Sequence, residues 1–176
     1  STTLRCASGR LALLSPRDDL THSSCAQAEK AFQQARQVAP YLFDGMELYS
    51  ATLWHLRAPT ALSSLAQELM VVDPHHPSSW IASGNVFSQV EDHASALRCF
   101  KRAAQLDDTC VYAYTLSGHE CVMLEEWERA LGFFRESVRR DPLHYNAWWV
   151  SLVLPLSYER ALTRRTHASG SVSATS

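Results

Sequence analysis

The chain has 176 residues, of which 46% are hydrophobic and 19% charged, and its formal net charge is −2. This length suits one domain or a short array of repeats, and the balanced charge excludes a general attraction to nucleic acid or to an anionic membrane. No apolar run reaches the ~18 residues that a transmembrane helix needs. Residues 11–14 are too short for a secretory signal, and a first residue other than Met suggests a piece of a longer protein.

The cysteines give no sign of a disulfide framework or a metal site. Their number is odd and no pair has the C-x-x-C spacing, so we expect reduced, mostly buried thiols in an intracellular protein. The string that begins at His119-Glu120 lacks the second His of a zinc-protease motif. His75 and His76 precede Pro77 and are expected in a solvated turn. The five cysteines are Cys6, Cys25, Cys99, Cys110 and Cys121.

The main signal is an internal repeat of 34 residues. Pro40 and Pro74 are one such step apart, and Pro142 lies two further steps on. A fixed period of this length indicates repeated supersecondary units. The same step relates Met46, Trp80, Tyr114 and Trp148; Ser50, Gly84 and Gly118; Ala28, Leu62, Ala96 and Ala130; and Phe32, Ala66, Phe100 and Phe134.

Each repeat is expected to form two helices. Residues 1–24 should be irregular or a degenerate helix because Pro16 interrupts them, and a helix at about 25–39 follows. Asp44 and Glu47 predict a capping box, and Asp92 predicts a helix cap. A 27-residue segment, 150–176, departs from the repeat and is expected to be aberrant and partly disordered. Helix pairs are expected at 44–72, 78–106 and 112–140 with another start at 145, within repeat units at 25–42, 43–76, 77–110 and 111–144.

The repeated small and aromatic residues are expected to pack the helices together. Gly84 and Gly118 fall inside helices, where Gly costs about 1 kcal/mol relative to Ala. We therefore expect a close helix approach at each of them, with Ala96 and Ala130 supplying the matching small surface. The expected packing residues are Trp80, Gly84, Ala96, Phe100, Tyr114, Gly118, Ala130 and Phe134.

These columns resemble the tetratricopeptide (TPR) pattern of an aromatic residue, then Gly, Ala, Phe, Ala and Pro. The resemblance implies an all-α fold: a right-handed superhelical α-solenoid of antiparallel helix pairs, with about three repeats and irregular ends. A single pair cannot bury its apolar face, so neighbouring pairs stack, and the first helices line a concave groove.

Four stretches resemble one TPR family more closely, the cell division cycle protein 27 family, which is subunit three of the anaphase-promoting complex (cyclosome). They are residues 43–56 (FDGMELYSATLWHL), 83–88 (SGNVFS), 113–120 (AYTLSGHE) and 144–148 (HYNAW). The resemblance implies a non-catalytic scaffold of a ubiquitin ligase that is nuclear, and cytoplasmic in mitosis, and that needs no cofactor. Its implied partners are the other TPR subunits and the C-terminal Ile-Arg tails of coactivators and of a core subunit.

The expected groove suits an extended peptide. Amide side chains such as Asn85 can donate to and accept from a peptide backbone, and a ligand Arg would pair with Glu120, the one acid expected there. The basic residues Arg98, Lys101, Arg102, Arg135, Arg139 and Arg140 all fall on second helices, and hence on the convex side. The candidate groove residues are Asn85, Gln89, Tyr112, Thr115, His119, Glu120 and Asn146.

Two other functions stay open at this stage. One is a different TPR peptide-binding adaptor, in a chaperone or trafficking complex, although the groove lacks the Lys and Arg that an acidic chaperone tail would need. The other is the TPR part of an enzyme whose catalytic domain lies elsewhere. The sequence shows no nucleophile–base pair, phosphate loop or complete metal set, so no catalytic or metal residue is predicted.

Overall fold

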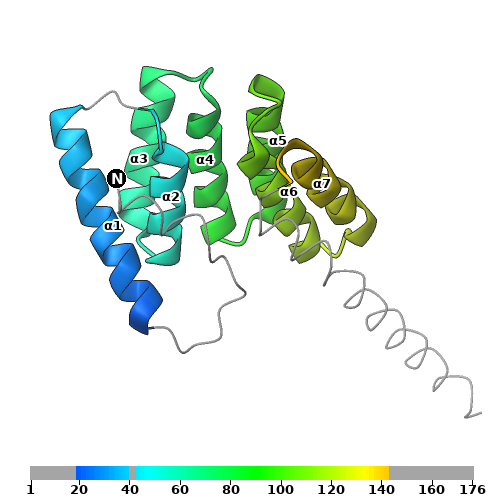
Figure 1. Cartoon of the computed structure of the whole chain (residues 1–176), viewed down its shortest axis with the longest axis horizontal. Coiled ribbons are helices and arrows are strands. Elements are labelled where there is room, and N and C mark those ends of the chain that lie inside the picture. The colour runs from blue at the N-terminus through cyan, green and yellow to red at the C-terminus, as the bar shows by residue number, and fades with distance from the viewer. Residues whose placement is uncertain (1–18, 40–42, 143–176) are drawn as a thin grey trace, which may run out of the picture.

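The computed structural model describes residues 19–39 and 43–142 (Figure 1). This part of the chain contains seven α-helices and no strand. The array runs along the longest axis of the molecule, from its first helix at one side of the view to its seventh at the other. They are α1 (Asp19–Val38), α2 (Met46–His55), α3 (Pro59–Val72), α4 (Pro77–Gln89), α5 (His93–Leu106), α6 (Val111–Met123) and α7 (Trp127–Arg140).

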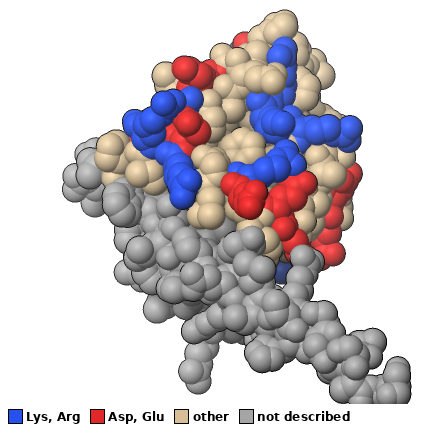
Figure 2. All heavy atoms as spheres, turned by 90° about the vertical axis from the view of Figure 1, so that its right-hand side faces the viewer, with Lys and Arg blue, Asp and Glu red and all other residues tan. Residues whose placement is uncertain are grey.

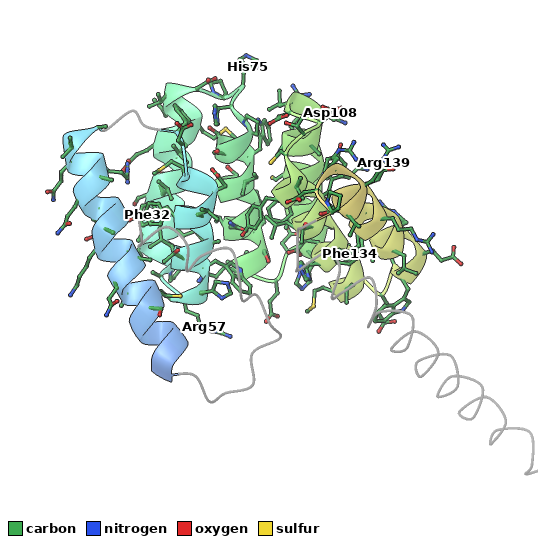
Figure 3. All side chains as sticks on the ribbon, viewed as in Figure 1. Phe32, Arg57, His75, Asp108, Phe134 and Arg139 are labelled. Carbon is green, nitrogen blue, oxygen red and sulfur yellow. The ribbon has the colours of Figure 1, made fainter. Side chains whose placement is uncertain are left out.

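Six of these helices form three antiparallel pairs, which confirms the predicted α-solenoid of the TPR type. The pairs are α2–α3, α4–α5 and α6–α7, and the second helix of each pair also packs against the first helix of the next. In Figure 3 the turns between pairs, marked by His75 and Asp108, lie at one edge, and the turn within a pair at Arg57 lies at the opposite edge. Helix α1 spans Asp19–Val38 and so extends before the predicted start at 25, while residues 1–18 of the expected irregular segment lie outside the described part.

One of the two predicted caps, that at Asp92, agrees with the structure, and the helix expected from residue 78 begins one residue earlier. Pro77 occupies the first turn of α4, and the Asp92 carboxylate accepts a hydrogen bond from the Ser95 N–H at 3.1 Å. The predicted capping box of α2 is wrong. Gly45 takes the N-cap position at φ 82°, and the Glu47 carboxylate instead accepts from the Ser78 hydroxyl of α4. A tertiary partner therefore replaces the local one.

The first helix of each pair ends in a Schellman turn without glycine. After α4, the Glu91 N–H donates to the Ser88 carbonyl and the Asp92 N–H to the Phe87 carbonyl. Glu91 has a left-handed φ of 63°, a conformation that usually belongs to Gly. Arg57 and Glu125 repeat this geometry at φ 51° and 59° after α2 and α6. Each turn thus carries backbone strain of about 1 kcal/mol.

Replacing Glu91 by glycine should raise the free energy of unfolding by about 0.5–1 kcal/mol. The substitution relieves the left-handed strain and removes a negative charge from the C-terminal end of α4, where the helix dipole disfavours it. Urea titration followed by circular dichroism measures the change. The matched control is Glu68→Gly inside α3, which should lower stability by about 1 kcal/mol, and an equal effect of both changes would contradict the assignment.

Three apolar clusters form the core, and each one crosses the boundary between neighbouring pairs. Ala82 of α4 belongs to the cluster built by α2 and α3. Ala113 of α6 joins the cluster around Phe100 of α5. Leu97 of α5 joins the cluster around Phe134 of α7. Neighbouring pairs therefore share their buried surface.

The helical glycines make room for aromatic rings. A Cβ on Gly84 would lie 2.4 Å from the nearest carbon of the Phe100 ring, and one on Gly118 would lie 2.6 Å from the Phe134 ring. The close approach at both glycines is as predicted, but its partner is not. The nearest atoms belong to the phenylalanines rather than to Ala96 and Ala130, because the long ring reaches across the helix interface.

Candidate functional site

Side-chain hydrogen bonds join the first helices of neighbouring pairs. The Ser78 hydroxyl of α4 donates to the Glu47 carboxylate of α2 at 3.1 Å. Two turns further along α4, the Asn85 amide nitrogen donates to the Ser50 hydroxyl at 2.9 Å. These bonds place α2 and α4 side by side with polar groups between them. We call the surface formed by α2, α4 and α6 the inner surface.

Helix α6 brings Tyr112 toward the same acid. Burial raises the pKa of Tyr112 well above its ordinary value, and the Glu47 carboxylate raises it further. The electrostatic effect of Glu47 therefore extends beyond α4 to the start of α6. An acid and a hydroxyl from two successive first helices thus meet on the inner surface, within electrostatic range of the Tyr112 phenol.

The two amides of α4 differ in accessibility. Asn85 is only 4% exposed, and its amide group is directed toward Ser50 of α2. Gln89 is half-buried at the last position of α4. Gln89 is therefore the more open of the two predicted backbone-binding groups.

Thr115 and His119 lie toward α7. The Thr115 hydroxyl is 2.8 Å from the Ser137 hydroxyl of α7, and the residue is 2% exposed. The half-buried His119 ring meets the Phe134 ring edge-on, with 5.2 Å between their centroids. The structure thus places Thr115 within the packing of a pair, and His119 against its aromatic core.

Glu120 is turned away from the inner surface. Its carboxylate lies 2.7 Å from Nδ1 of His93 in α5, and the residue is 4% exposed. One residue along a helix rotates the side chain by about 100°, and this step directs Glu120 to the preceding pair. The structure therefore brings Glu47, and not Glu120, into a hydrogen bond with Ser78. Glu47 occupies the repeat position of the predicted groove residue Thr115, two 34-residue steps earlier in the chain. This equivalence could have identified Glu47 as a candidate.

The remaining predicted residues lie in the packing or beyond the described part. Asn146 and the tail 150–176 fall outside the described residues, and so does the helix start at 145. The Trp80 indole donates to the Pro74 carbonyl at 2.8 Å, and the Arg140 guanidinium lies 4.0 Å from the centroid of the Tyr114 ring. Gly84, Ala96, Phe100, Gly118, Ala130 and Phe134 are all buried.

The described cysteines are free thiols. Burial raises the pKa of all four, that of Cys121 to about 11, so the thiolate form is disfavoured at neutral pH. Within residues 19–39 and 43–142, no three His, Cys, Asp or Glu side chains come together as metal ligands would. No helix in the same ranges is both long and apolar enough to span a membrane.

A pocket of about 390 Å³ lies away from the inner surface, between the C-terminal ends of α1 and α3. None of the predicted groove residues contributes to it. Its surface is mostly apolar, with the ion pair between Arg36 and Glu68 at one side. The lining residues are Arg36, Phe43, Gln67, Glu68, Leu69, Val71 and Val72.

Comparison with known proteins identifies clear relatives. No protein-family model matches the chain. Protein bimA of Emericella nidulans is 48% identical over 123 residues, which is 70% of this chain and 15% of that protein. Anaphase-promoting complex subunit 3 of Schizosaccharomyces pombe is 43% identical over 123 residues, 70% of this chain and 18% of that protein. The Caenorhabditis elegans cell division cycle protein 27 homolog is 42% identical over 124 residues, 70% of this chain and 16% of that protein.

A solved structure shares the fold. The crystal structure of the APC/C hetero-tetramer Cut9-Hcn1 aligns with a TM-score of 0.65 at 19% identity, covering 68% of this chain and 23% of that chain. The present chain spans less than a fifth of the length of the curated relatives named above. Over 70% of its length, the chain is therefore similar to the cell division cycle protein 27 family, as its sequence motifs predict.

Proposed function

We propose that the chain is a non-catalytic TPR scaffold unit of the anaphase-promoting complex, in the nucleus and, during mitosis, the cytoplasm. In this role it packs against other TPR subunits and binds C-terminal Ile-Arg tails of coactivators and of a core subunit on its inner surface. The observation that carries the proposal is the 43% identity to anaphase-promoting complex subunit 3 over 123 residues. Stacked helix pairs with shared apolar clusters suit a scaffold.

The charges of the inner surface support a ligand that ends in arginine. Helices α2, α4 and α6 contain no Lys or Arg. Their acids are Glu47 and Glu120, of which Glu120 is occupied by His93. We therefore assign the pairing with the ligand Arg to Glu47. A guanidinium can form two parallel hydrogen bonds with one carboxylate.

The open amide, Gln89, supplies a complementary backbone contact. Gln89 is accessible at the end of α4, and Asn85 lies one helical turn before it. An amide side chain can donate to a peptide carbonyl and accept from a peptide N–H at the same time. An extended tail can therefore bind along α4 while its terminal Arg reaches Glu47.

Glu47→Gln should weaken binding of a ten-residue peptide ending in Ile-Arg by about tenfold, because a charge-assisted hydrogen bond contributes about 1.5–3 kcal/mol. The same variant should lose the preference for this peptide over one ending in Ile-Gln. Gln89→Ala should weaken both peptides several-fold, and Asn85→Ala should weaken them less, because its buried amide donates to Ser50. Fluorescence anisotropy with labelled peptides measures the affinities, and circular dichroism checks the fold.

Gln33→Ala is the matched control. Gln33 is an exposed amide on α1, outside the inner surface, and it donates a hydrogen bond to Glu29 of the same helix. It should leave both affinities unchanged. Equal affinity of the unmodified chain for the Arg and Gln peptides would refute the recognition of arginine. Preferential binding of an acidic chaperone-tail peptide that displaces the Ile-Arg peptide from the inner surface would instead favour a chaperone adaptor.

A further inference from the structure

Positive charge is concentrated on the second helices of the last two described pairs. Helix α5 contains three cationic residues and no acidic residue. Helix α7 contains four arginines and two glutamates. The whole chain, in contrast, has a formal net charge of −2. Lys and Arg are therefore concentrated on the second helices α5 and α7, whereas the inner surface of α2, α4 and α6 has none.

The cations of α5 share one helix face and are open to solvent. Arg98, Lys101 and Arg102 stand at i, i+3 and i+4, and all three are exposed. Arg98 donates to the Ser95 hydroxyl at 3.0 Å and Arg102 to the Gln105 amide oxygen at 3.3 Å, both neutral groups. Within the described part of the chain, no carboxylate forms an ion pair with any of the three.

Helix α7 also carries exposed cations, but only partly at equivalent positions, since Gly132 and Glu136 stand where α5 has Arg98 and Arg102. One 34-residue step leads from Lys101 to Arg135 and from Gln105 to Arg139. Arg135 is exposed, and the Arg139 side chain remains 73% exposed although it pairs with Glu136 at 2.9 Å. Figure 2, which faces the α7 end of the array, shows Lys and Arg spread over its upper part with some Asp and Glu among them, and a larger group of Asp and Glu lower down.

An exposed second helix does not require such charge. Helix α3 contains no Lys or Arg. At the positions equivalent to Arg98, Lys101 and Arg102 it carries Ser64, Gln67 and Glu68. Like charges at i and i+4 repel and destabilise a helix by a few tenths of a kcal/mol. The cations of α5 therefore weaken the helix slightly in isolation, and a bound anion would remove this repulsion.

We propose that the outer surface of α5 and α7 binds an acidic, Asp- and Glu-rich segment of a partner protein. We name this surface the basic stripe and define it as Arg98, Lys101, Arg102, Arg135 and Arg139. The guanidinium groups bind carboxylates in pairs of hydrogen bonds, and successive positions along two helices suit several acids in sequence. Because the stripe lies on second helices, its ligand and an inner-surface ligand bind without competing.

The probe is a fluorescein-labelled twelve-residue peptide with six Glu spaced by Gly and Ser, measured by anisotropy against the full chain. We expect it to bind at least tenfold more tightly than the analogue with Gln in place of Glu. Affinity should fall at least tenfold between 50 and 300 mM NaCl, since salt screens exposed charges. The double variant Lys101→Glu with Arg135→Glu should weaken binding at least tenfold.

The matched control is Lys30→Glu with Arg57→Glu, which makes the same change in net charge at exposed residues outside the stripe. It should change affinity less than twofold. Equal losses in both double variants would overturn the proposal, because binding would then follow net charge. Binding of a single-stranded DNA 20-mer more tightly than the acidic peptide, abolished by the stripe variant, would overturn the commitment to a protein segment. Circular dichroism confirms that both variants remain helical.

Discussion

Replacing Phe100 by alanine should lower the free energy of unfolding by about 3–5 kcal/mol. The ring is fully buried in α5 and packs with Ile81 and with Ala113, so it touches the helix before and the helix after its own. Its removal leaves a cavity where two pairs meet, and the surrounding helices can collapse into it only in part. Urea titration followed by far-UV circular dichroism measures the loss.

Phe87→Ala is the control for this change. Phe87 is an aromatic residue of neighbouring helix α4, but it is 38% exposed and belongs to none of the three clusters. We expect it to cost less than about 1.5 kcal/mol, since less apolar surface leaves the core. Similar losses for both variants would show that Phe100 does not have the bridging role described here.

Gly84→Ala should destabilise the protein by about 1–3 kcal/mol, although alanine is the better helix former. The new Cβ would lie 2.4–2.8 Å from three atoms of the Phe100 ring, which no real contact tolerates. The ring is stiff and fully buried, so α4 and α5 must move apart. Thermal and urea unfolding both report the change.

Gly132→Ala on α7 should raise the stability of the protein, where Gly84→Ala lowers it. No atom lies within 4 Å of its added Cβ, and the position is exposed, so the variant should gain about 1 kcal/mol of stability. A second comparison isolates the clash. In a Phe100→Ala background, Gly84→Ala should lose most of its cost, because the ring that it meets is absent. An unchanged cost in that background would exclude Phe100 as the cause.

The sequence predicts the helix pairs well because their signals are local or strictly periodic. The 34-residue step locates each pair, and Pro77 and Asp92 act within one turn of the chain. It predicts less well which atoms meet between helices. Gly84 correctly indicates a close approach, but the predicted partner, Ala96, is wrong, and the nearest atoms belong to Phe100. The reach of a ring across an interface depends on the relative rotation of both helices.

The same limit applies to the candidate site. His119 and Glu120 are neighbours in sequence, yet one meets α7 and the other meets α5. Glu47 fits a local capping pattern, but a hydroxyl from the next pair competes successfully for its carboxylate. The direction of each side chain around its helix decides the first case, and competition between a local and a distant partner decides the second. The sequence alone predicts neither.

The shared apolar clusters determine how such an array loses its structure. When one pair opens, Ala82, Leu97 or Ala113 of the adjoining pair is exposed to water, so the neighbour loses part of its own free energy of folding. Unfolding of one pair therefore favours unfolding of its neighbour, so the helix pairs do not unfold independently. A ligand that contacts several helices would stabilise the adjoining pairs together. Ligand binding should therefore raise the unfolding cooperativity of the array as well as its stability.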